Sequence, residues 1–266
     1  MFESTIDKFA DTGAKMASDV KHKTLAYFVG AMMAGAYIGF GDILMFTVGA
    51  HAGPAWGHLI MGAVFAVGLT LVVFAGASLF TGVTMYMALA VLRKKATLTD
   101  LLQVWVVCWI GNFAGAFVLA AILKLAGGGV LLTDGADMFF GVVAGKVAAA
   151  ATPLLFKAIL CNWLVCLGIW MAARTTSDAA KLGLVFWPVM LFVACGYEHC
   201  VANMFAFSLA LLADHPGGVT FAGVAYNLSW VTLGNIIGGA VMMGFGYWVQ
   251  TSNSDRVAVP AAAKRV

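Results

Sequence analysis

The chain has 266 residues, of which 62% are hydrophobic and only 10% are charged. Apolar segments longer than ~18 residues recur along its whole length, which excludes an ordinary soluble domain and predicts an all-α protein that crosses a membrane several times. The formal net charge is +3 and the basic residues are scattered, so nothing indicates nucleic-acid binding. The five cysteines follow no disulfide or zinc-ligand spacing, and we expect no metal, no cofactor and no enzymatic activity.

The first 23 residues favour an amphipathic helix. Ile6 and Phe9 fall on the helical face opposite Asp7 and Lys8. Such a helix either lies on the membrane surface or covers the mouth of a pore. A first span rich in small residues follows at about 24–49, where close packing against other helices is expected.

The second apolar stretch, residues 56–92, contains no Asp, Glu, Lys or Arg. It is too long for one straight helix across a hydrocarbon core of ~30 Å and too short for two complete spans. Its weak point is residues 76–82, where glycines flank hydroxyl groups. We expect a helix to about Ala75, an irregular loop and a half-helix to Leu92. Backbone that is not helical at this depth must be buried in protein or line a cavity.

A second overlong apolar run covers residues 182–213, which as one helix would extend for ~48 Å. The helix is therefore either strongly tilted or interrupted near Gly196. Glu198 and His199 lie side by side just after this glycine, with no other charge in the run. Because ionisable groups at membrane depth are costly, the pair predicts a functional site.

Six spans account for the chain, and they place both termini on the same side of the membrane. Twelve of the fifteen Lys and Arg residues lie in the tails and loops of that side, which the positive-inside rule assigns to the cytoplasm. The predicted organisation is a single transmembrane domain. Residues 1–23 form its cytoplasmic amphipathic helix, 24–250 its six-span channel and 251–266 its cytoplasmic tail.

The sequence also repeats part of itself. Gly-Asn-Phe-Ala-Gly-Ala at 111–116 resembles Gly-Asn-Ile-Ile-Gly-Gly at 234–239. The interrupted spans are the second and the fifth, the middle members of two triplets, and a repeat of three spans must be inverted. Inverted repeats with matching broken helices predict a transport site near the bilayer midplane. The alternative is coincidence in a glycine-rich chain.

Two side chains would meet at the two breaks. A half-helix N-terminus offers unpaired N–H groups and a partial positive charge, which suits an anion. His199, unlike the other four histidines, lies deep in an apolar span, and it can stabilise or protonate a weak-acid anion opposite Thr81 at the other break. A neutral packing histidine is the alternative. Glu198 is expected to support the loop, by bonding its backbone or orienting the break.

Lys146 follows a glycine before the fourth span, on the outer side. It either attracts anions into a vestibule or snorkels toward the interface. Asn112, Asn162 and Asn235 lie within spans, where amides commonly join neighbouring helices.

Four motifs are specific enough to indicate a family. They are Ala-Ser-Leu-Phe-Thr-Gly at 77–82, Cys-Asn-Trp-Leu-Val-Cys at 161–166, Gly-Tyr-Glu-His at 196–199 and Val-Thr-Leu-Gly-Asn at 231–235. Together they resemble the formate/nitrite transporter family over nearly the whole chain, and most closely its nitrite channels of the bacterial inner membrane. The resemblance implies an aquaporin-like protomer with its own pore, assembled into a homopentamer.

The resemblance also implies roles for individual residues. His199 matches the central pore histidine, Thr81 its partner and Lys146 the vestibule lysine, while Asn162 and Asn235 match asparagines of the pore region. Positions that line the family's constrictions match Phe65, Leu69, Phe80, Val165 and Phe192. Ser78 departs from the family, whose members commonly carry an acidic residue there, so the means by which the loop is supported is open.

The expected function is transport of small monovalent anions, nitrite first and formate or hydrosulfide next, with protons as a possible second partner. A neutral-solute channel shares the six-span plan with two breaks, although the chain lacks Asn-Pro-Ala at the breaks. A membrane haem protein would need two histidines that face each other within spans, and His199 is the only histidine deep in a span of this sequence.

Overall fold

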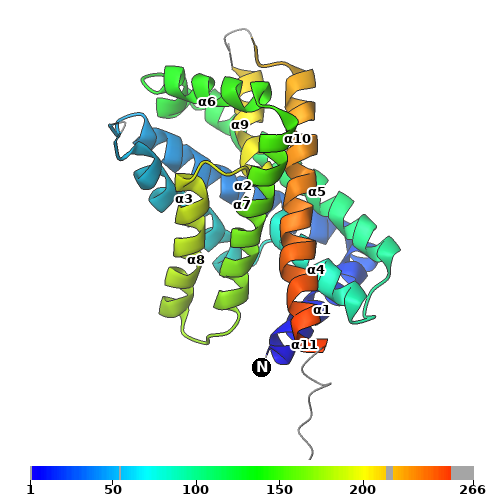
Figure 1. The fold of residues 1–266 in the computed structure, drawn as a ribbon. Coiled ribbons are helices and arrows are strands. Elements are labelled where there is room, and N and C mark those ends of the chain that lie inside the picture. Colours follow the sequence, from blue (N-terminus) through cyan, green and yellow to red (C-terminus); the bar gives the residue numbers. More distant parts are fainter. Residues whose placement is uncertain (1, 54, 214–217, 253–266) are drawn as a thin grey trace, which may run out of the picture.

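The structure, a computed structural model, describes residues 2–53, 55–213 and 218–252, and every regular element in these ranges is a helix (Figure 1). The predicted all-helical class is therefore confirmed. Five helical segments in this part of the chain are long and apolar enough to cross a membrane. They are α2 (Thr24–Gly49), α3 (Gly57–Ala75), α5 (Leu98–Leu125), α7 (Ala151–Ala172) and the segment Phe221–Thr251.

The other helices in the described residues are shorter or, like α1 (Glu3–His22), richer in charged residues. Two apolar ones, α4 (Phe80–Leu92) and α9 (Cys200–Leu212), have 13 residues each. α4 follows α3 after residues 76–79, and α9 follows α8 (Asp178–Ala194) after residues 195–199. In each case a helix stops and a half-length helix begins within one apolar run. α6 (Ala136–Ala148) and a short 3₁₀ helix, η1 (Gly129–Leu132), lie between α5 and α7.

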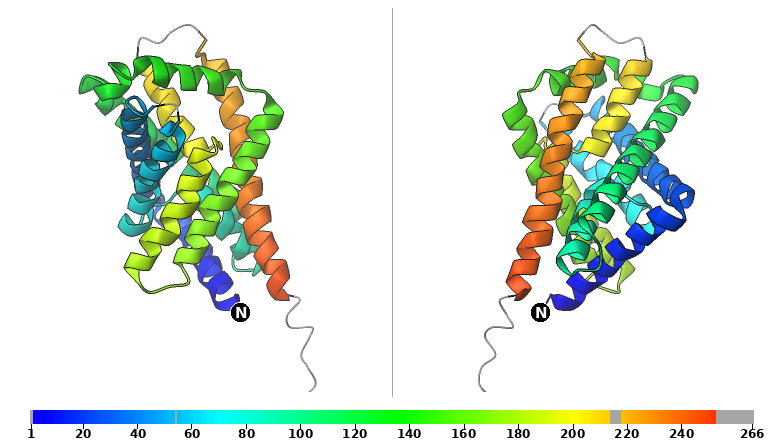
Figure 2. Two further views of the ribbon diagram at one scale, coloured as in Figure 1. Left: turned by 60° about the vertical axis from the view of Figure 1, so that its left-hand side comes forward. Right: turned by 90° about the vertical axis from the view of Figure 1, so that its right-hand side faces the viewer.

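The amphipathic helix α1 (Glu3–His22) packs its apolar face against α4, and Ile6 and Phe9 are buried there. Arg93, which follows α4, lies 3.3 Å from Glu3 and 3.2 Å from Asp7. α1 lies at one end of the molecule and α6 at the other (Figures 1 and 2). The helix therefore packs against the rest of the protein through its apolar face.

Glycines allow two pairs of helices to approach closely. A Cβ atom on Gly35 of α2 would overlap the backbone of Asn112 in α5, and one on Gly238 would overlap the backbone of Ile159 in α7. Close backbone contact is typical of helices that associate in lipid. The pair α2 and α5 thus resembles the pair formed by α7 and the last long helix in its close backbone contact at a glycine.

The last long helix changes its pitch partway. α10 (Phe221–Ile236) continues as the π-helical segment η2 (Ile237–Phe245) and then as α11 (Gly246–Ser252). π-helical turns often occur near functional sites. Of the expected tail at 251–266, residues 253–266 lie outside the described residues.

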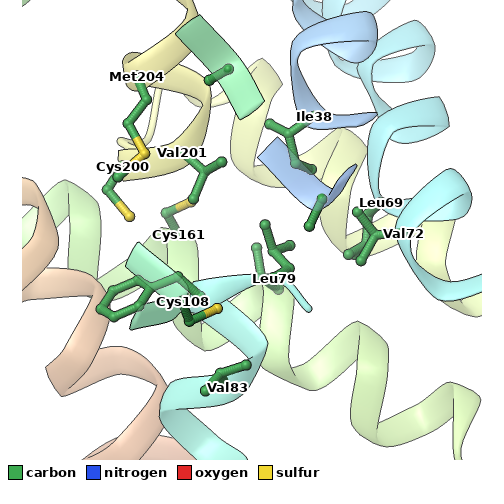
Figure 3. Packing of buried hydrophobic residues seen from close by; sticks show 14 of the residues in the cluster. Ile38, Leu69, Val72, Leu79, Val83, Cys108, Cys161, Cys200, Val201 and Met204 are labelled. Atoms are coloured by element: carbon green, nitrogen blue, oxygen red, sulfur yellow. The ribbon is translucent and has the colours of Figure 1, made fainter. Parts of the chain in front are cut away.

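Apolar side chains from both half-helices meet in the core. Leu79 before α4 and Val201 in α9 are buried within one cluster (Figure 3). Cys108, Cys161 and Cys200 belong to the same cluster as free thiols. The core therefore surrounds the two helix breaks.

Candidate transport site

The two helix breaks have the same local structure. Gly76 ends α3 with φ of +78°, and Gly196 follows α8 with φ of +67°. Glycine adopts positive φ at little cost, so each helix can stop abruptly in an apolar setting. The chain then extends to Leu79 and to His199, the N-cap residues of α4 and α9.

Two asparagines bind the breaks in the same way. The Phe80 N–H donates to Asn112 Oδ1 at 2.8 Å, and the Cys200 N–H donates to Asn235 Oδ1 at 2.9 Å. Asn112 Nδ2 donates to the carbonyl of Ser78 at 2.9 Å, as Asn235 Nδ2 donates to that of Glu198 at 3.0 Å. Each carboxamide therefore satisfies backbone groups that an interrupted helix leaves unpaired. At Ser78 the loop is held through its backbone, which needs no acidic side chain.

Thr81 and His199 meet across the two breaks. Thr81 Oγ1 lies 3.2 Å from His199 Nε2, and both residues are buried. His199 Nδ1 accepts a hydrogen bond from the Ala202 N–H at 3.1 Å, which caps α9. A nitrogen that accepts carries no proton, so the neutral ring holds its proton on Nε2. The N–H group therefore points toward Thr81.

Asn162 of α7 joins the two half-helices. Its Nδ2 lies 3.1 Å from the carbonyl oxygen of Thr81 and 2.5 Å from that of Asn235. It also lies 3.1 Å from Thr84 Oγ1. The structure thus brings Asn162, Asn235, Thr81 and His199 into one polar centre.

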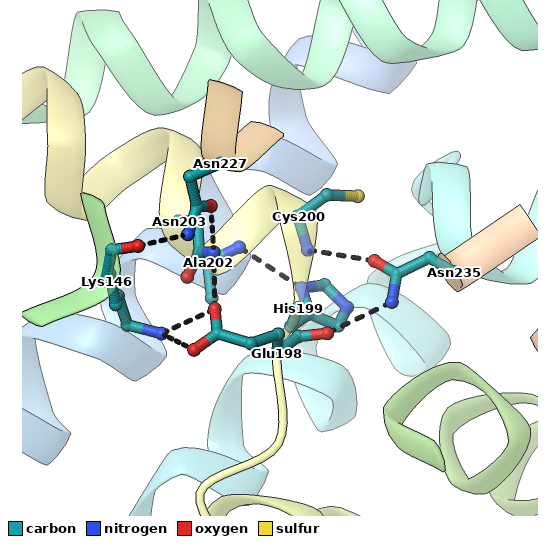
Figure 4. A network of polar contacts seen from close by, with 8 residues as sticks. All are labelled: Lys146, Glu198, His199, Cys200, Ala202, Asn203, Asn227 and Asn235. Carbon is teal, nitrogen blue, oxygen red and sulfur yellow. Dashed lines mark hydrogen bonds and ion pairs between the residues drawn. The ribbon is translucent and has the colours of Figure 1, made fainter. Parts of the chain in front are cut away.

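Lys146, which is partly buried, and Glu198, which is buried, form an ion pair beside this centre (Figure 4). Lys146 Nζ lies 2.9 Å from each carboxylate oxygen, and Asn203 Nδ2 donates to the same carboxylate at 2.7 Å. Asn227 accepts from Asn203 at 2.9 Å and donates to the Lys146 carbonyl at 2.8 Å. The Glu198 side chain bonds other side chains, whereas its backbone carbonyl is bound by Asn235.

Two cavities approach the polar centre from opposite ends. The α6-side cavity has a volume of about 290 Å³ and is lined by Lys146, Glu198 and His199, among others. The α1-side cavity, of about 590 Å³, reaches Leu79 and Gly82. His199 lines the α6-side cavity, and Gly82, the residue after Thr81, lines the α1-side cavity, so the contact between Thr81 and His199 joins the segments that border the two cavities.

The expected constriction residues are all buried, but they lie in different surroundings. The rings of Phe65 and Phe192 meet edge to face at 5.9 Å between centroids, and both line the α6-side cavity. Phe192 also stacks on His199 at 5.9 Å. Leu69 and Val165 line neither cavity, and Phe80 lies along an apolar groove between α5 and α10.

Three polar residues near this centre were not predicted from the sequence. Asn203 and Asn227 hold the ion pair, but an asparagine within a span gives no indication of its partner. Asp42 of α2 also lines the α6-side cavity and is 2% exposed. The sequence does mark Asp42 as a candidate, because an acidic residue inside an apolar span is costly.

The helices are apolar, and two cavities lead toward a buried polar contact. This arrangement is typical of a membrane channel or transporter. The family model described as formate/nitrite transporter matches residues 3–249. The chain belongs to the formate/nitrite transporter family, as the four motifs indicated.

Individual relatives agree with this assignment. The chain is 45% identical to nitrite transporter NirC of Salmonella typhimurium, an alignment that covers 99% of this chain and 96% of the relative. A solved FNT family ion channel superposes with a TM-score of 0.91 at 42% identity, covering 94% of this chain and 99% of that one. A pentameric formate channel with formate bound gives a TM-score of 0.73 at 30% identity, covering 87% and 99%.

Proposed function

We propose that the chain transports small monovalent anions of weak acids across the bacterial inner membrane, nitrite first and formate second. The observation that carries the proposal is the buried contact between Thr81 and His199, which joins two segments that border separate cavities. The nitrite and formate proteins among its relatives support the choice of substrate.

The proposed architecture has six spans with broken second and fifth members. α3 with α4 forms the second span and α8 with α9 the fifth, and the other four spans are α2, α5, α7 and the segment Phe221–Thr251. The matched bonds of Asn112 and Asn235 to the two breaks support an inverted, aquaporin-like repeat of three spans. Residues 24–250 form the channel in this proposal.

Both termini face the cytoplasm in the proposed orientation. Arg93, Lys95 and Arg174 contact α1 or the residue before it, so basic residues gather at the α1 end. The α6-side cavity then opens to the outside. Residues 1–23 and 251–266 are cytoplasmic in this scheme.

The proposed assembly is a homopentamer with a pore in each protomer. The related formate channel is described as pentameric, which supports this number. Large apolar side chains are exposed on the outside of the helices, among them Phe156, Trp187 and Phe221. Such side chains suit contact with lipid or with other subunits.

The anion would enter through the α6-side cavity past Phe65 and Phe192, whose rings exclude water. An isolated anion is costly to bury, so it needs a donor where its water is removed. The Nε2–H of His199 is that donor, because Nδ1 is held by the Ala202 N–H. To give a proton away, His199 must first be protonated at Nδ1, which breaks the cap of α9. Stabilisation by hydrogen bonding is therefore favoured over an obligatory proton relay.

Uptake into proteoliposomes with clamped membrane potential and pH tests the proposal. We expect nitrite to enter fastest, formate next, and both far faster than into vesicles without protein. The His199→Phe variant is the matched control and should lose anion uptake. Fast osmotic swelling with a neutral solute, together with no anion uptake, would overturn the proposal in favour of a neutral-solute channel.

A further inference from the structure

Asp42 is a buried acid in the α6-side cavity. It lies within α2, is 2% exposed and lines that cavity. Its Oδ2 atom is buried and has no hydrogen-bond partner within the described residues. Among the ion pairs of the described chain, none involves Asp42, although Lys146 lines the same cavity. A buried polar group that nothing satisfies requires an explanation.

The surroundings of Asp42 contain few groups able to compensate a charge. The cavity lining holds six other ionisable groups, from α3, α6, α7 and the segment between α8 and α9. They are His58, Lys146, Lys157, Tyr197, Glu198 and His199. The other elements packed against α2, namely α1, α5, α9 and η1, contribute no Asp, Glu, Lys, Arg or His to this lining.

The charge of Lys146 is compensated by Glu198. Lys146 makes two 2.9 Å contacts with the Glu198 carboxylate, so the pair contributes no net charge. Lys157 is the other lysine of the lining. Counting the lysines as cations, Glu198 as an anion and the histidines as neutral, the cavity carries no net charge with Asp42 ionised and one positive charge with Asp42 protonated. A single charge in a cleft with walls of low dielectric constant changes the local concentration of anions.

The chemistry of the carboxyl group distinguishes the same two states. Ionised, Asp42 only accepts hydrogen bonds and repels an anion. Protonated, it offers an O–H donor in a cavity whose other acid, Glu198, is occupied. The buried oxygen without a donor suits the neutral form, since a desolvated carboxylate without partners is costly.

We infer that Asp42 is a proton-binding residue of the α6-side cavity. When Asp42 is protonated, its O–H group donates a hydrogen bond to the anion and so admits the anion to the cavity. The inference rests on the proposed anion transport. It adds to His199 a second side chain that would donate a hydrogen bond to the anion. Transport from the outside then depends on outer pH through Asp42, separately from any proton chemistry at His199.

Infrared difference spectroscopy of the purified protein detects a protonated carboxyl group directly, and the first measurement uses the wild-type protein. We expect a carboxylic C=O band that disappears on alkaline titration and shifts when nitrite is added. Asp42→Asn should remove this band, and Asp137→Asn, which changes an exposed acid at the start of α6, should keep it. If no band is lost in Asp42→Asn, or nitrite leaves the band unmoved, the inference is overturned.

Exchange of isotopically labelled nitrite, with equal pH on both sides of the vesicle, completes the test. Wild-type exchange should fall over the same pH interval in which the band is lost, whereas Asp42→Asn should lose that fall. An unchanged fall in Asp42→Asn contradicts the role of Asp42 and leaves the proposed function standing. Absence of wild-type exchange for both nitrite and formate contradicts the proposed function, and the admitting role with it.

Discussion

Lys146 Nζ lies 2.9 Å from both carboxylate oxygens of Glu198, although 52 residues separate the two in the chain. Glu198 is anchored further by Asn203. The lysine is therefore not a free attractant for anions, and the glutamate is not simply a loop support. Each residue allows the other to remain charged at a depth where either alone would be costly.

We expect Lys146→Met to destabilise the protein by about 3 kcal/mol, because it leaves the Glu198 carboxylate buried without its cation. The Lys146 side chain is 20% exposed, so the lower end of the range for a broken buried pair applies. The double variant Lys146→Met with Glu198→Gln should recover most of the loss. Thermal unfolding in detergent measures both, and equal stability of the single and double variants would contradict the pairing argument.

Parts of this arrangement follow from the sequence alone. The two breaks were predictable because an apolar run of either length exceeds the bilayer, and glycine marks the point of interruption in each. The meeting of Thr81 and His199 followed from treating the breaks as equivalent halves of a repeat. Both inferences depend on lengths and periodicity, which a sequence carries directly.

Other parts depend on which residues come together in three dimensions. Nothing near Lys146 in the chain indicates that Glu198 is its partner, or that Asn227 binds its carbonyl. The expected constriction residues share apolar character, yet Phe192 stacks on His199 and Phe65 packs on Phe192, whereas Leu69 and Val165 line neither cavity. Asp42 lies inside an uninterrupted span, where neither excess length nor a break marks the position as part of a site.

His199 combines a structural and a chemical role that substitution can separate. Asparagine is a favourable N-cap, so His199→Asn should keep the bond from Ala202 while it removes the N–H directed at Thr81. We expect this variant to retain near wild-type stability and to lose most nitrite uptake. His199→Phe should lose uptake too, and about 1 kcal/mol of stability with the cap.

Thermal unfolding and uptake measured on the same preparations provide the comparison. Normal uptake by a stable His199→Asn variant would show that the Nε2–H group is not needed by the anion.

Asn112 and Asn235 should prove equivalent in stability. Alanine at either position leaves a backbone N–H at the start of a half-helix buried without an acceptor, at a cost of about 1–3 kcal/mol. We expect Asn112→Ala and Asn235→Ala to lower the unfolding temperature by similar amounts. Ser229→Ala, which removes an exposed hydroxyl bonded within its own helix, is the control and should change little. A large effect from only one asparagine would contradict the matched roles of the two breaks.

Gly239 tests whether the π-helical segment supports the polar centre. A Cβ atom there would overlap Thr84 Oγ1 and lie 2.6 Å from Asn162 Nδ2. Gly239→Ala should therefore cost about 1–3 kcal/mol through overpacking and reduce nitrite uptake, because Asn162 holds the carbonyl of Thr81. Gly246→Ala is the matched control, since its Cβ would lie 3.8 Å from the carbonyl oxygen of Val241, an ordinary van der Waals contact. We expect the control to fold and transport normally, and similar behaviour of the two variants would mean that the close contact at Gly239 does not constrain the site.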